Sequence, residues 1–188
     1  PHREAMLRHV RAVQQSNTDD ASTLAHAAIA LALATQDYRT ALSMIERAIS
    51  SNPSSAHAFG HGSVINTWAG HYDRSIEFSD TALRLSPYDP LGVMPLAGQA
   101  GARLMKGDYE GAASYAERAL QVYKTHTPSF LILISSLVRL GHLSEAKEQA
   151  SQLLEASPSY HIVAKAPIFE FFVDELLAAG LSEMPVSR

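Results

Sequence analysis

The amino-acid sequence predicts an all-α solenoid, in which antiparallel helix pairs stack along the chain. Three observations predict it: a globular apolar content, a repeat of about 34 residues, and apolar residues at helical spacing inside each repeat. Because one helix pair cannot bury its own apolar face, neighbouring pairs must stack to form a core.

The composition excludes several classes of protein. Of the 188 residues, 46% are hydrophobic and 18% are charged, which is too apolar for a disordered chain. No run approaches the ~18 apolar residues of a membrane-spanning helix. The net charge of −4 comes with no basic face for nucleic acid, and the absence of cysteine excludes disulfides, thiol catalysis and cysteine-based zinc sites.

Spacings of 34 and 37 residues recur in three residue classes. They relate the glycines Gly70, Gly107 and Gly141 and the small residues Ala41, Ser75, Ala112 and Ala146. Pro53 and Pro87 are 34 residues apart, and Pro158 follows Pro87 by one spacing of each length. Each unit therefore contains two helices with a polar turn between them, and a proline follows the second helix except in the third unit, which has Lys124 at that place. The small residues suit the close crossing of the two helices of a pair.

The register predicts a single array over residues 1–188. Its parts are a partial preceding repeat at 1–21, repeats at 22–55, 56–89, 90–126 and 127–160, and a capping helix with a tail at 161–188.

Two elements depart from the simple pattern. Pro95 falls inside the expected first helix of the third repeat, which is either kinked there or starts late, and Asp89-Pro90 is typical of a helix start. Pro167 can open a last helix that ends at Gly180. That helix is expected to cap the open end of the array; dimerisation or filling of the groove are the alternatives.

The turn Gly70-His71-Tyr72, followed by Ser75, Ala82 and Pro87, resembles the tetratricopeptide repeat. The same positions recur in the other repeats, with Gln36 in place of glycine in the first. The resemblance implies a right-handed superhelical solenoid of antiparallel helix pairs that binds a partner protein or peptide on its concave face. Carried over to this sequence, the concave-face candidates are His26, Ala30, His57, Val64, Trp68, Leu131, Ser135 and Arg139.

Trp68 is the only tryptophan and is either an anchor for the partner or a packing residue between repeats. The co-chaperone subgroup of the family grips a C-terminal carboxylate with Lys, Asn and Arg. The matching positions here carry His26, Ala30, His61, Leu91 and Pro95, so we expect no carboxylate clamp.

A narrower resemblance rests on residues 85–90, the longer third repeat and residues 176–181. These are similar to the C-terminal repeats of bacterial regulators that carry an adenylate or guanylate cyclase domain or a winged-helix domain. The resemblance implies a cytoplasmic, bacterial signalling protein. Since the chain starts at Pro1 without an initiator Met, we expect it to be a fragment of such a protein.

No motif for catalysis is found. His57 and His61 lie four residues apart, as metal ligands on one helix often do. The sequence places no third ligand, however, so both are expected to be surface residues of the helix. Asp19-Asp20 is expected to be a solvated loop. We therefore expect no enzyme activity, no cofactor and no metal.

The function that the sequence favours is a protein–protein interaction scaffold, with no nucleic acid or membrane partner and a possible homodimer. The alternatives are a sensor of a small ligand or a metal, built on the histidine-rich second repeat, and an oligomerisation module of a multidomain adenylate cyclase.

Overall fold

The computed structural model describes residues 2–16, 18–87, 92–162 and 168–182. The helices are α1 (His2–Gln15), α2 (Ala21–Thr35), α3 (Tyr38–Ser51), α4 (Ala56–Trp68), α5 (Tyr72–Leu85), α6 (Val93–Met105), α7 (Tyr109–Val122), α8 (Thr127–Arg139), α9 (Leu143–Ala156), the 3-10 turn η1 (Phe169–Phe171) and α10 (Val173–Ala178). The described ranges contain no β-strand, which confirms the all-α prediction. None of the described helices is long and apolar enough to cross a membrane.

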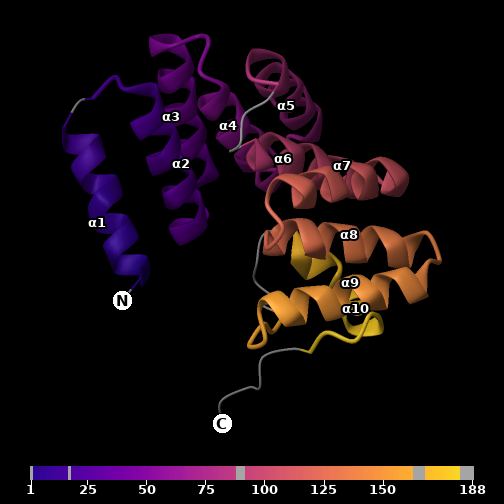
Figure 1. Ribbon diagram of the computed structural model, residues 1–188. Coiled ribbons are helices and arrows are strands. Elements are labelled where there is room, and N and C mark those ends of the chain that lie inside the picture. The colour runs from indigo at the N-terminus through magenta and orange to yellow at the C-terminus, as the bar shows by residue number, and fades with distance from the viewer. Residues whose placement is uncertain (1, 17, 88–91, 163–167, 183–188) are drawn as a thin grey trace. The chain divides into compact units, whose positions relative to one another are not determined.

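The chain forms two compact units, Pro1–Gln99 and Ala100–Arg188, called the first and second unit below. In the first unit α2 packs against α1 and α3, and α4 packs against α2, α3 and α5 (Figure 1). In the second unit α8 packs against α7, α9 and α10. Within each unit, successive helices thus pack on one another, as in a solenoid.

The turn inside each pair has the conformation that the glycines predict. Gly70, Gly107 and Gly141 have φ of +82°, +80° and +83°, the left-handed region in which glycine ends a helix at low cost. Gln36 adopts the same region with φ of 60° at the matching place in the first pair. The backbone geometry is therefore kept even where the sequence lacks glycine.

The small residues of the repeat lie where the two helices of a pair cross. Ala41, Ser75, Ala112 and Ala146 are all completely buried. The approach of α6 to α4 is equally close, because a Cβ on Gly98 would lie 2.2 Å from Ser63 Oγ. Packing at this density leaves no room for larger side chains at these positions.

The two elements that depart from the simple repeat pattern are the first helix of the third pair and the last helix. The helix α6 starts late, at Val93, so that Pro95 falls in its first turn, where a missing N–H costs little. Asp89-Pro90 and Pro167 lie outside the described residues. The last helix is shorter than predicted, since η1 precedes it and α10 begins only at Val173.

Candidate functional site

Charge is distributed unevenly over the helices of the first unit. α2, α4 and the part of α6 that ends at Gln99 contain no Asp, Glu, Lys or Arg, whereas α3 and α5 carry several. The titratable side chains on α2 and α4 are three histidines, His26, His57 and His61. α2 and α4 are the first helices of their repeats. The face that they form is therefore uncharged whenever its histidines are neutral.

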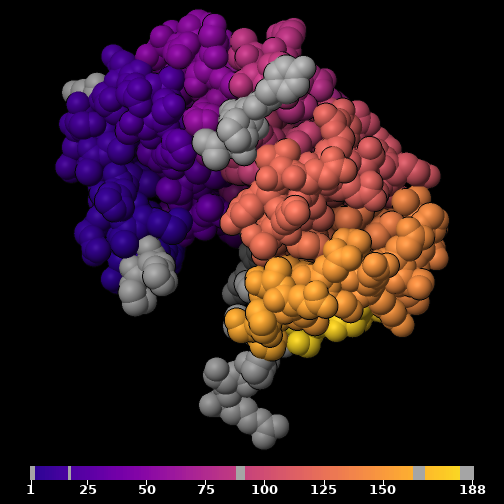
Figure 2. Space-filling view, in the orientation of Figure 1, coloured from indigo at the N-terminus to yellow at the C-terminus, as the bar shows by residue number. Residues whose placement is uncertain are grey.

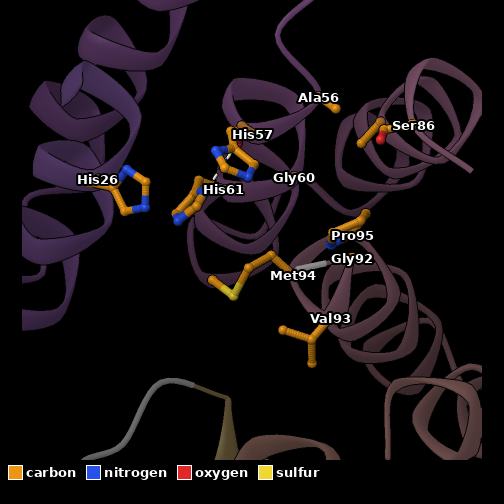
Figure 3. A pocket seen from close by; sticks show the side chains of 11 residues that line it. His26, Ala56, His57, Gly60, His61, Ser86, Gly92, Val93, Met94 and Pro95 are labelled. Carbon is orange, nitrogen blue, oxygen red and sulfur yellow. Dashed lines mark hydrogen bonds between the residues drawn. The ribbon is translucent and has the colours of Figure 1, made fainter. Parts of the chain in front are cut away.

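The three histidines come together although they belong to two repeats (Figure 3). The ring centroid of His26, on α2, lies 5.7 Å from that of His57 and 4.9 Å from that of His61, both on α4. The two rings on α4 are 6.1 Å apart. Packing of α2 against α4 thus builds a cluster, called the histidine cluster below, that spacing along one helix did not reveal.

Two of these rings have a defined tautomer. Nδ1 of His26 lies 2.7 Å from the carbonyl oxygen of Ser22, and Nδ1 of His61 lies 2.9 Å from that of His57. A carbonyl oxygen can only accept, so each Nδ1 donates its proton. In the neutral ring Nε2 is then left as a hydrogen-bond acceptor.

His61 is neutral over a wide pH range. It is only 8% exposed, and this burial lowers its pKa to about 4, with the nearby His26 and His57 acting in the same direction. The interpretation of His61 as a helix-surface residue is therefore wrong. The reason is tertiary: α2 packs against the side of α4 that carries the ring.

The histidine cluster lines a pocket of ≈170 Å³ in the first unit. Figure 3 shows the His61 ring pointing away from its own helix, into the space between His26 and Met94. The lining residues are His26, Ala56, His57, Gly60, His61, Ala82, Ser86, Gly92, Val93, Met94 and Pro95. One side of the pocket is thus formed by imidazoles and the other by apolar side chains from the start of α6.

The other candidates on α2 and α4 differ in accessibility. Ala30 is half-buried and, with His26, lines a shallow groove between α1 and α2. Val64 is buried. Trp68 is partly buried against the core of this unit, with its ring centroid 6.4 Å from that of Tyr38. Of its two expected roles, packing is the one for which the structure gives contacts.

The second unit places Leu131, Ser135 and Arg139 differently. Leu131 and Ser135 are buried on α8. Arg139 contacts the C-terminal segment, a name used below for η1, Phe172 and α10. Its Nε lies 2.7 Å from Glu175 Oε1, and its guanidinium lies 5.7 Å from the centre of the Phe172 ring. In Figure 2 this segment, in yellow, lies against the orange helices of the same unit. The candidates on α8 are therefore covered or occupied.

The histidine cluster is not arranged as a metal site. Within the described ranges no group of three or more His, Cys, Asp or Glu side chains could hold a metal ion. The rings meet edge to face or tilted.

Sequence reasoning missed part of this site. It placed His26 and His57 on one face, but it did not include His61, Met94 or Pro95 among the binding residues. A signal for His61 was present, since it lies four residues after His57 and so shares its side of the helix. The clamp register put Pro95 in the same set of inner positions as His26 and His61. Nothing in the sequence placed Met94 opposite these histidines, because that depends on where α6 starts.

Comparison with known proteins agrees with this architecture. Residues 30–90, from the middle of α2 to beyond α5, match the model of the tetratricopeptide repeat family. No curated protein sequence matches the chain.

Solved structures with the same fold cover most of the chain. YrrB, a tetratricopeptide repeat protein with an unusual peptide-binding site, is 17% identical with a TM-score of 0.57, over 90% of this chain and 88% of its own. TTC0263, a thermophilic tetratricopeptide repeat protein of Thermus thermophilus, is 23% identical with a TM-score of 0.59, over 78% and 81%. The Cut9–Hcn1 hetero-tetramer of the APC/C contains a chain that is 13% identical with a TM-score of 0.72. The match covers 94% of this chain and 33% of that chain.

By its fold the chain is thus a solenoid of helix pairs of the tetratricopeptide type. The family match itself covers residues 30–90, about a third of the chain.

Proposed function

We propose that this chain is a protein–protein interaction module that binds a partner protein or peptide on the face made by α2 and α4. The observation that carries the proposal is the combination of an uncharged face with a pocket at the histidine cluster. Recognition on such a face requires no covalent chemistry.

The absence of charge on this face limits the partner. A charged side chain buried against it would lose its hydration without gaining an ion pair, which costs free energy. The binding segment of the partner is therefore uncharged and largely apolar. A chaperone-type acidic C-terminus does not fit, since the clamp positions His26, Ala30 and His61 supply no lysine or arginine.

The biological setting that we propose comes from the narrower sequence resemblance. It is that of a regulatory part of a larger bacterial signalling protein in the cytoplasm, with a cyclase or winged-helix domain elsewhere in that protein. The sequence around the chain in its gene tests this directly. A neighbouring domain of another class would contradict the setting and leave the binding face untouched.

The binding face is tested with peptides selected from a displayed random library. The affinity of the selected peptides is measured by fluorescence anisotropy for the parent, for Ala30→Arg on α2, and for Ser50→Arg on the exposed part of α3. We expect Ala30→Arg to weaken binding at least about tenfold and Ser50→Arg to leave it unchanged. Equal effects of the two substitutions, or no binders at all, would contradict the proposal. Circular dichroism checks that both variants are folded.

A further inference from the structure

We propose that the pocket at the histidine cluster is a subsite for one tyrosine side chain of the partner, whose hydroxyl donates a hydrogen bond to Nε2 of His61. This inference rests on the proposed function, because it names the residue type that the binding face selects. It goes beyond the general use of a concave face and depends on side chains particular to this chain.

The histidine nitrogens that line the pocket favour a ligand group that donates a hydrogen bond. Nδ1 of His26 and Nδ1 of His61 already donate to backbone carbonyls of their own helices. The Nε2 atoms of these rings make no hydrogen bond to any described residue, and in the neutral ring they can only accept. A ligand group that only accepts, such as a carboxylate or a phosphate, therefore finds no hydrogen-bond donor on the neutral rings of His26 and His61.

The size and the opposite wall favour a single aromatic ring. A volume of ≈170 Å³ is below the roughly 300–1,000 Å³ of typical small-molecule sites, so the pocket fits one side chain. Met94 and Pro95 form an apolar wall facing the imidazoles (Figure 3). Methionine sulfur and imidazole edges both make favourable contacts with aromatic rings.

Charge excludes the cationic donors. The described lining residues include no carboxylate, so the ammonium of lysine or the guanidinium of arginine would be desolvated here without a counter-ion. Tyrosine combines an apolar ring with a hydroxyl donor at its tip and is smaller than tryptophan. Tyrosine therefore supplies a hydrogen-bond donor, fits the volume and the apolar wall, and brings no charge into the pocket.

The test is an NMR titration of the parent protein that follows the histidine ring resonances. The probe is the capped peptide acetyl-Gly-Ser-Tyr-Ser-Gly-amide, with phenylalanine or O-methyltyrosine in place of tyrosine as matched controls. We expect the tyrosine peptide to shift the resonances of His26, His57 and His61 and to bind about fivefold more tightly than either control, as one hydrogen bond implies. Equal affinity of the three peptides would overturn the subsite.

A pair of substitutions localises the effect. Ala56→Leu adds bulk to the pocket lining, whereas Ser54→Leu lies in the exposed turn before α4. We expect only Ala56→Leu to abolish the preference for tyrosine. If library-selected peptides bind the face of α2 and α4 without any preference for tyrosine, the subsite is wrong and the proposed function stands.

A separate titration with Zn²⁺ tests whether the histidine cluster is a metal site instead. Micromolar binding of Zn²⁺ that EDTA reverses, together with no response to the tyrosine peptide, would show a metal site and overturn this proposal.

Discussion

The first helices of the repeats, α2 and α4 in the first unit and α8 in the second, differ in what packs against them. In the first unit the histidine cluster on α2 and α4 borders a pocket that no described side chain fills. In the second unit Leu131 and Ser135 on α8 are buried, and the C-terminal segment holds Arg139. The same repeat geometry thus keeps a pocket in the first unit, whereas in the second unit α10 packs against α8.

The residues at these positions differ accordingly. The first two turns of α4 carry His57, Gly60 and His61, which line the pocket. The matching positions of α8 carry Pro128, Leu131 and Ile132, of which Leu131 and Ile132 are buried. We infer that the second unit stabilises the array while the first unit binds the partner.

The largest effect is expected from Leu176→Ala in the C-terminal segment. Leu176 is completely buried, so its truncation should destabilise the second unit by about 2–5 kcal/mol. Hydrogen exchange measured peptide by peptide should show lost protection in α8 and unchanged protection in α2. Leu177→Ala is the matched control, because Leu177 is 42% exposed and its loss should cost less than about 0.5 kcal/mol. Equal effects would mean that the segment does not cover α8.

Acid should weaken both units through one histidine each, buried in the first unit and half-buried in the second. Burial lowers the pKa of His61 in the first unit and of His126 in the second from 6.5 to about 4. The unfolded state therefore takes up these protons first as the pH falls. Stability should decrease from about pH 6.5 to about pH 4, by roughly 3 kcal/mol at most for His61.

Local probes separate the two histidines. Trp68 is the only tryptophan and reports on the first unit, while hydrogen exchange in α8 reports on the second. His61→Gln should flatten the pH dependence seen by Trp68 fluorescence, and His126→Gln should flatten that of α8. An unchanged pH profile in His61→Gln would show that this ring is not a buried neutral histidine.

A smaller effect should distinguish two ion pairs, one in each unit. Glu175 in the second unit is 11% exposed, so Glu175→Gln leaves Arg139 without its charge partner and should cost about 1–3 kcal/mol. Glu46 pairs with Arg74 in the first unit, but both side chains are more than half exposed, and Glu46→Gln should cost less than about 1 kcal/mol. Urea unfolding of the two variants measures the difference. A greater cost at Glu46 would contradict the covered state of the second unit.

The smallest effect concerns the turn that departs from the repeat. Gln36 has a left-handed backbone where the other turns have glycine. Gln36→Gly should stabilise the first unit by up to about 1 kcal/mol, and Gly107→Gln should destabilise the second by a similar amount. Thermal melting of both variants tests this symmetry; a stabilising Gly107→Gln would show that backbone strain does not govern these turns.

The fold followed from the sequence because its determinants are local and repeated. The glycine turns and the small residues Ala41, Ser75, Ala112 and Ala146 mark places where only one backbone geometry or one side-chain size fits. Where the determinants were not local, prediction was incomplete. The start of α6 at Val93 and the short α10 depend on what packs against them.

The site was predictable only in part for the same reason. The register assigned His26 and His57 to first helices, and the structure brings their rings together. The burial of His61 and the contact of Arg139 with Glu175 arise from helices distant in sequence. The periodicity of one helix contains no information about them.

The central claim is that α2 and α4 bind the partner while α8 does not. Hydrogen exchange of the chain with and without a library-selected peptide at saturation tests it most directly. We expect the peptide to increase protection in Ala21–Thr35 and Ala56–Trp68 and to leave Thr127–Arg139 unchanged. Protection confined to Thr127–Arg139, or to the charged helices α3 and α5, would contradict it.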